Sequence, residues 1–95
     1  MATYELKIEM SLNHGNGYSE KEDEHFCGTS LLSLFKKMDK ILNEYDSSWF
    51  IQVWFYKIDN LRYYKIKDDT ICVENEDDRS LLSYFTTSGQ APFDA

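Results

Sequence analysis

Residues 3–12 read TYELKIEMSL, a stretch in which every second side chain is apolar. The apolar positions are Tyr4, Leu6, Ile8, Met10 and Leu12. Threonine, glutamate, lysine and serine occupy the positions between them. A period of two over ten residues is typical of a half-buried β-strand. We therefore expect this segment to lie in a sheet with one face against a core.

The segment after this strand, residues 13–17, is expected to form a tight turn that reverses the chain. Residues 13–17 read NHGNG, and Gly and Asn accept the positive φ that tight turns need. Residues 18–27 are highly charged and alternate poorly. They are compatible with a second strand at the sheet edge or with a loop, and the sequence leaves both open.

Residues 31–45 predict an amphipathic helix that Thr29 or Ser30 can cap. Apolar side chains recur there at three- and four-residue spacing, at Leu31, Leu34, Phe35, Met38, Ile41, Leu42 and Tyr45. Polar and charged side chains occupy the opposite side. A single apolar stripe indicates a helix that packs on a sheet.

Residues 49–73 are expected to form three strands joined by two-residue turns at 59–60 and 68–69. Both turns place apolar residues on the same side of a three-stranded meander, with Phe55 facing Tyr64 and Ile66 facing Ile71. A one-residue slip would destroy this agreement. The apolar side holds Trp49, Ile51, Val53, Phe55, Tyr64, Ile66, Ile71 and Val73.

These segments together predict an α+β fold. It is an antiparallel sheet of four to five strands with one amphipathic helix packed on one face, followed by a short C-terminal helical turn at 79–85. Residues 1–85 are expected to form a single domain, and residues 86–95 a flexible C-terminal tail.

The same register predicts an aromatic face on the other side of the sheet, carrying Trp54, Tyr56, Leu61 and Tyr63. A solvated sheet face is usually more polar. A cover is therefore expected, either from residues 81–85 folding back or from a partner or second copy. Aromatic side chains near lysines also suit single-stranded nucleic acid, but the charge of the chain opposes that reading.

The net charge of −7 over 95 residues argues against direct binding to nucleic acid or to an anionic membrane. No apolar run has the length of a membrane span, and the N-terminus lacks a signal-peptide layout. Cys27 and Cys72 are the only cysteines, and we expect both to be buried and reduced. A cytoplasmic location is the default expectation.

Acidic residues gather in two runs. The first holds Glu20, Glu22, Asp23 and Glu24, and the second holds Glu74, Glu76, Asp77 and Asp78. Asp68 and Asp69 could extend the same surface. Such runs are commonly solvated loops, or alternatively a surface that docks on basic side chains. The spacing at 75–78 does not match a calcium-binding loop.

No catalytic constellation is apparent, and we expect neither an enzyme nor a metal or other cofactor. His25 and Cys27 could pair as base and nucleophile, but no third orienting group is evident. The spacing of the two histidines and two cysteines matches no usual zinc pattern. Phosphate-binding glycine loops and nucleophile elbows are also missing.

In size, acidity and β-rich layout the chain resembles the small inhibitor proteins of bacteriophages, which include anti-CRISPR proteins and DNA mimics. The resemblance covers the whole chain, rests on composition and carries over no residue. The expected function is a non-catalytic inhibitor that docks on a basic surface of a nucleic-acid-handling protein. The alternative is a structural, assembly or adaptor subunit, such as a homodimer, that associates through the aromatic face.

Overall fold

The computed structural model describes residues 2–59, 64–67, 70–73 and 79–87, with the backbone alone for 64–67 and 70–73. Its elements are β1 Thr3–Asn13, β2 Ser19–Gly28, α1 Leu31–Glu44, β3 Trp49–Ile58, β4 Tyr64–Lys67, β5 Thr70–Val73 and β6 Arg79–Thr86. Among these residues, no helix has the length and hydropathy of a membrane span.

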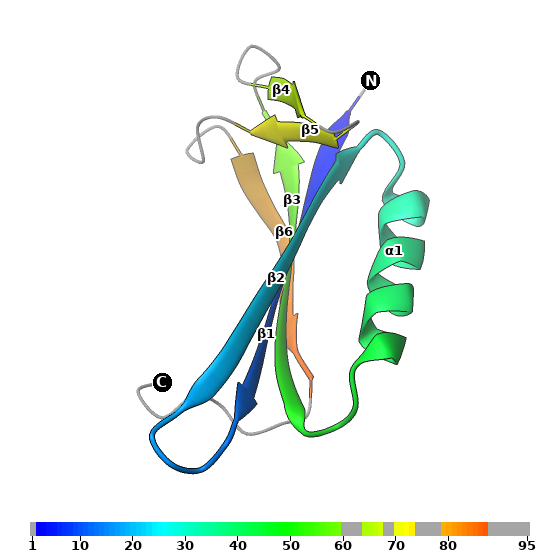
Figure 1. Cartoon of the computed structure of the whole chain (residues 1–95). Helices are drawn as coiled ribbons and strands as arrows, with labels where there is room; N and C mark the ends of the chain where they lie inside the picture. The colour runs from blue at the N-terminus through cyan, green and yellow to red at the C-terminus, as the bar shows by residue number, and fades with distance from the viewer. Residues whose placement is uncertain (1, 60–63, 68–69, 74–78, 88–95) are drawn as a thin grey trace.

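Four strands form one antiparallel sheet in the order β2-β1-β3-β6, and α1 covers one of its faces (Figure 1). The alternating segment 3–12 becomes the inner strand β1, with a partner on each side. Leu6 lies opposite Phe26 of β2 and Phe55 of β3. The predicted α+β fold, with one helix on an antiparallel sheet, is confirmed.

Residues 19–28 are a strand, which resolves the alternative that the sequence left open. Gly15 and Gly17 have φ of 89° and 73° in the connecting turn, and the backbone N–H of His14 donates to the carbonyl of Tyr18 at 3.0 Å. The β1–β2 register runs without a break from Tyr4–Gly28 to Asn13–Ser19. The alternation of β2 is poor because β2 is an edge strand and most of its side chains are exposed on both sides.

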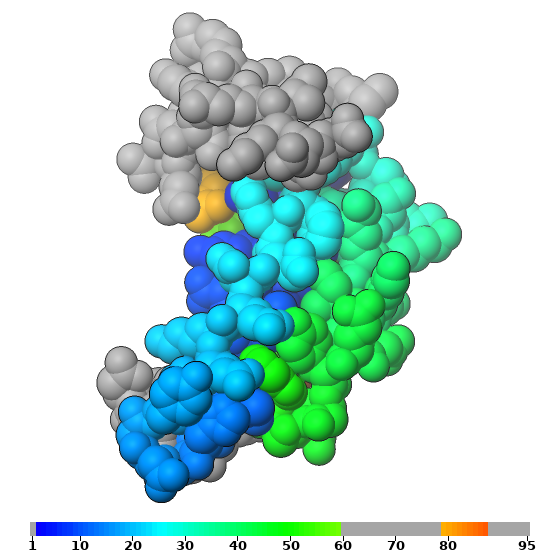
Figure 2. All heavy atoms as spheres, viewed as in Figure 1, coloured from blue at the N-terminus to red at the C-terminus, as the bar shows by residue number. Residues whose placement is uncertain are grey.

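The helix α1 begins after Ser30, whose side chain accepts a hydrogen bond from the backbone N–H of Ser33 at 3.2 Å. Leu34 and Ile41 point into the core and are buried. Phe35 belongs to the predicted stripe but remains 42% exposed, although its ring packs 4.8 Å from that of Phe55. Figure 2 shows α1 and β2 side by side along one side of the molecule.

The core lies between α1 and the inner strands. Its buried members are Leu6, Ile8, Met10, Leu34, Ile41, Ile51, Val53 and Phe55. Residues of β1 and β3 supply most of this set, because these two strands are flanked on both sides and face the helix. The apolar sides predicted for residues 3–12 and 49–55 are therefore the sides that the fold buries.

The predicted three-stranded meander is wrong at its first step. β3 pairs with β1 and β6, and β4 pairs with β5 in a separate two-stranded sheet. β1 occupies one side of β3 and β6 the other, where β6 makes seven paired positions against the four residues of β4, so the longer ladder forms more backbone hydrogen bonds. The predicted β4–β5 register is confirmed, with Tyr64 opposite Val73 and Ile66 opposite Ile71.

The predicted C-terminal helical turn is also wrong, because residues 79–86 form the strand β6. Its register against β3 shifts between Phe55 and Tyr56, so that Leu82 is an extra residue between paired neighbours. This bulge interrupts the two-residue alternation and leaves an apolar spacing that resembles a helix. Beyond β6, the backbone N–H of Thr87 donates to the carbonyl of Ile51 at 2.9 Å, and residues 88–95 of the predicted tail lie outside the described residues.

Candidate functional site

Four of the predicted acidic contact residues line β2, and all four are exposed. Glu20, Glu22 and Glu24 lie on the α1 side of the strand, opposite the apolar residues of β1. Asp23 lies on the other side, opposite Glu9. The remaining six predicted residues fall outside the described residues: Asp68, Asp69, Glu74, Glu76, Asp77 and Asp78.

Two members of this acidic row have partners within the chain. The hydroxyl of Tyr45 donates a hydrogen bond to Glu22, and Nε2 of His14 lies 3.3 Å from Oε1 of Glu20. The hydrogen bond to Glu22, then burial and the nearby negative charges, raise the pKa of Tyr45 to about 12. The α1 side of β2 is therefore a region of negative potential.

A hollow of about 410 Å³ lies where β1, β2 and β3 meet, mainly on the sheet face away from α1. Its lining residues are Glu9, Met10, Ser11, Lys21, Glu22, Asp23 and Gln52. Ligand pockets for small apolar molecules are lined mainly by hydrophobic side chains. The charged lining here suits a polar or basic group of a partner better.

Trp54 and Tyr56, the two residues of the predicted aromatic face that the structure describes, lie on the sheet face away from α1. Trp54 packs 5.2 Å from Tyr84 of β6, and Nζ of Lys7 lies 5.3 Å from the Trp54 ring. The guanidinium of Arg79 lies 3.8 Å over the ring of Tyr56. Leu61 and Tyr63, also predicted for this face, lie outside the described residues.

Tyr84 was missed as a member of this face, because its segment was predicted to be helical. It is 46% exposed, and Nε2 of Gln52 donates to its hydroxyl at 2.9 Å. Its β6 neighbours Leu81 and Leu82 are 56% and 49% exposed. The described part of the aromatic face is therefore continued by an apolar edge strand.

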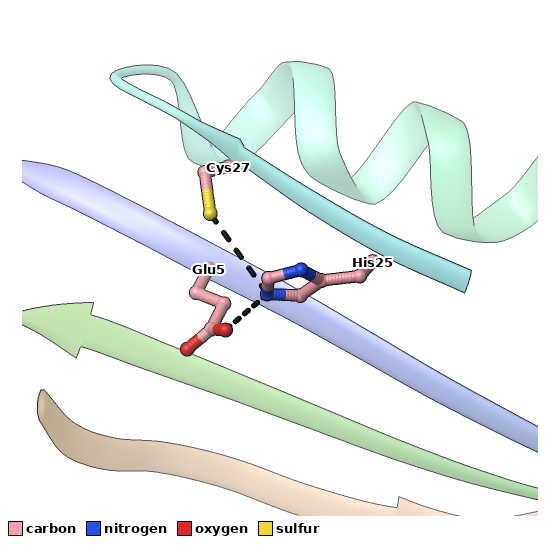
Figure 3. A group of neighbouring side chains, drawn as sticks. All are labelled: Glu5, His25 and Cys27. Atoms are coloured by element: carbon pink, nitrogen blue, oxygen red, sulfur yellow. Dashed lines mark hydrogen bonds and ion pairs between the residues drawn. The ribbon is translucent and has the colours of Figure 1, made fainter. Parts of the chain in front are cut away.

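Three side chains with metal-binding or reactive groups meet at the end of the sheet where β1 begins (Figure 3). Glu5 on β1 is directly opposite Cys27 on β2. Its carboxylate is hydrogen bonded through Oε2 to Nε2 of His25, and Nη1 of Arg79 donates to Oε1 at 2.5 Å. Sγ of Cys27 lies 4.0 Å from the same Nε2.

Glu5 is a buried charge, with its side chain only 3% exposed. Burial acts to raise its pKa, but the hydrogen bonds and positive charges of His25 and Arg79 outweigh burial and lower the pKa. Glu5 is therefore a carboxylate at neutral pH. A buried charge of this kind is tolerated only when it is paired and hydrogen bonded, as it is here.

The third orienting group that the sequence did not reveal is Glu5. Even so, the geometry does not fit a nucleophile and its base, because Glu5 and Cys27 approach the same ring nitrogen of His25. In a catalytic triad the acid and the nucleophile use different nitrogens of the imidazole. A proton shared between Nε2 and Glu5 leaves that nitrogen unable to accept the thiol proton.

The sequence pointed to His25 and Cys27 as a pair, but it carried no signal for Glu5 or Arg79. Glu5 lies on the polar side of its strand, where solvent is the ordinary expectation, and Arg79 is 74 residues away. Only the pairing of β6 with β3 brings Arg79 to Glu5.

Comparison of the chain with models of protein families, with curated proteins and with solved structures finds no match.

Proposed function

We propose that this chain is a small acidic binding protein that docks, without catalysis, on a basic surface of a nucleic-acid-handling protein. The observation that supports this proposal most directly is the row of exposed carboxylates on the edge strand β2, formed by Glu20, Glu22 and Glu24 on the α1 side, with Asp23 on the other side. Carboxylates two residues apart on a strand lie roughly 7 Å from each other on one side. A rigid row of this kind presents negative charge in a fixed arrangement.

Electrostatics support the same proposal. The chain carries a net charge of −7, so its field attracts basic surfaces and repels nucleic acid. A partner that holds phosphates with Lys and Arg has the complementary charge, and complementarity raises association rates and excludes other partners. An inhibitor of the phage type, anti-CRISPR-like or mimicking nucleic acid, is the specific form of this proposal that the size and acidity of the chain favour.

The experiment reverses charge on β2 without disturbing contacts inside the chain. Glu20 and Glu22 are left unchanged, because they contact His14 and Tyr45. The variant is Asp23→Lys/Glu24→Lys. The matched control is Asp39→Lys/Glu44→Lys on the exposed side of α1, which changes the net charge by the same amount.

Tagged protein is used to capture partners from a bacterial lysate at low salt, with mass spectrometry as the readout. We expect a nucleic-acid-binding protein that is released by added DNA, RNA or salt, and at least about tenfold less of it with the β2 variant. The control variant should capture nearly as much as the wild type. Equal losses in both variants, or capture that salt does not release, would contradict docking through β2.

A second role is favoured by a separate observation. Leu81, Leu82, Tyr84 and Phe85 of β6 are 36–56% exposed, and the Tyr84 ring lies 5.2 Å from that of Trp54. Exposed aliphatic and aromatic side chains grouped on an edge strand are typical of an association surface. We propose association through β6 as the alternative function, an assembly or adaptor role.

A further inference from the structure

We propose that Glu5, His25 and Cys27 form a Zn²⁺-binding site on the sheet face away from α1. Oε2 of Glu5, Nε2 of His25 and Sγ of Cys27 converge on one point between β1 and β2, as Figure 3 shows. The three ligand atoms all lie within 4.8 Å of one another. This assignment does not depend on the docking role of β2.

The backbone places these donors before any ion arrives. His25 and Cys27 are two residues apart on β2, so their side chains leave the strand on the same side. Glu5 lies opposite Cys27 in a ladder of ten consecutive β1–β2 pairs. A long unbroken register holds the three side chains in one place, which is the preorganisation that a metal site needs.

The donor set matches the preferences of zinc, which binds thiolate, imidazole and carboxylate in tetrahedral sites. Zn–S and Zn–N bonds of about 2.3 and 2.0 Å place tetrahedral sulfur and nitrogen ligands about 3.5 Å apart. The corresponding distance from Cys27 to His25 is 4.0 Å, so small side-chain rotations suffice. Three protein ligands leave a fourth position for water.

Binding displaces protons from the ligand atoms. Nε2 of His25 gives up its proton, to solvent from an imidazolium or to Nδ1 from a neutral imidazole, and the thiol proton of Cys27 leaves to solvent. The ion with one carboxylate and one thiolate is then neutral overall. No oxidation or reduction is involved.

Arg79 supports the site instead of competing for it. Its guanidinium binds Oε1 of Glu5, so Oε2 is the oxygen that faces His25. A ligating carboxylate is commonly oriented by a hydrogen bond of this kind. Lys7, opposite His25 on β1, has its ammonium 3.6 Å from Glu9 and over the Trp54 ring, so that charge has its own partners.

An ion can reach the site from solvent. The side chain of His25 is 37% exposed at the sheet edge, whereas Glu5 beneath it is only 3% exposed. Zinc would therefore bind between an exposed imidazole and a buried carboxylate. Once bound, it would tie β1 to the edge strand β2.

The test titrates the full chain, freed of metal by a chelator, with Zn²⁺ in a calorimeter. We expect one ion per chain with a Kd of about 1 μM or tighter. Cys27→Ser and His25→Gln should each weaken binding at least about tenfold. Cys72→Ser removes the other thiol of the sequence and His14→Gln the other imidazole, and both variants should leave the affinity unchanged.

Cobalt supplies a second readout, which is spectroscopic and independent of the calorimetry. Co²⁺ bound to a thiolate gives a sulfur-to-metal absorption band, which should appear in the wild type and in Cys72→Ser and vanish in Cys27→Ser. If Cys27→Ser fails to fold, His25→Gln compared with His14→Gln decides the question by affinity. Absence of Zn²⁺ binding, one ion per two chains, or equal loss in Cys72→Ser would overturn the proposed site.

Discussion

Glu5 and Tyr45 each join segments that are far apart in the sequence through one side chain. The carboxylate of Glu5 connects β1 to His25 on β2 and to Arg79 on β6. The phenol of Tyr45, at the end of α1, connects the helix to Glu22 on β2. Both side-chain interactions depend on the protonation of the groups involved, so a change of pH tests them directly.

Alkaline titration should single out Tyr45 among the seven tyrosines. Its pKa is raised to about 12 from an ordinary 10.0, chiefly because its hydroxyl donates to Glu22. The folded state therefore favours the protonated phenol. The stabilisation that follows is fully present below pH 10 and is lost as the pH rises from 10 towards about 12.

Ultraviolet difference spectroscopy of the phenolate measures this effect. Tyr45→Phe should remove a late-titrating step, and Glu22→Gln should move that step to lower pH. Tyr18→Phe, which deletes a 59% exposed phenol, is the control and should leave the late step in place. A late step that survives in Tyr45→Phe would show that another tyrosine produces it.

At the scale of the element, α1 depends on both its cap and the sheet beneath it. A 14-residue helix is marginal in isolation, since the first turn orders several residues for one hydrogen bond. Packing of Leu34 and Ile41 against the sheet supplies the main stabilisation. The cap at Ser30 satisfies one backbone donor that the helix itself cannot.

Removing that cap should destabilise the whole domain. Ser30→Ala is expected to lower the free energy of unfolding by about 1 kcal/mol, because the N–H of Ser33 loses its partner. Urea unfolding followed by circular dichroism measures the change. Ser33→Ala keeps that N–H and changes only an exposed side chain, and Thr29→Ala changes the other candidate cap. Both controls should lower the free energy of unfolding much less. An equal loss in either control would contradict Ser30 as the cap.

At the scale of the whole molecule, the two edges of the described sheet differ in chemistry. β2 carries four acidic residues at 20–24, whereas residues 80–87, which include most of β6, carry no charge. Two copies would repel along β2 through like charges. Along β6 they can approach, because an uncharged edge strand offers backbone groups and apolar side chains to a second strand.

Sedimentation velocity tests association through β6. Wild-type protein is expected to sediment faster as its concentration rises, with Leu82→Lys and Trp54→Ala remaining monomeric. Leu32→Lys is the matched control, since Leu32 is 63% exposed and belongs to α1, which Figure 1 shows apart from β6. A wild type that stays monomeric at every concentration, or a Leu32→Lys variant that dissociates equally, would remove the assembly role.

The sequence by itself determined those elements whose pattern is local. β1 follows from strict alternation, α1 from one apolar stripe after Ser30, and the β4–β5 register from a two-residue connection. Leu6, Ile8 and Val53 are buried, as the two-residue alternation of their strands predicts, because burying the apolar face of a strand removes it from water. The acidic row on β2 is likewise evident from composition.

Only the tertiary structure decided which strands pair and which polar side chains meet on the sheet face away from α1. β3 has β1 on one side and β6, not the neighbouring β4, on the other, and the β3–β6 ladder forms more hydrogen bonds than a four-residue β4 could. The bulge at Leu82 interrupts the two-residue alternation of β6, so periodicity did not predict this strand. Glu5 meets His25 and Cys27 through the β1–β2 register, and it meets Arg79 through the pairing of β3 with β1 and β6, since no local spacing connects these segments.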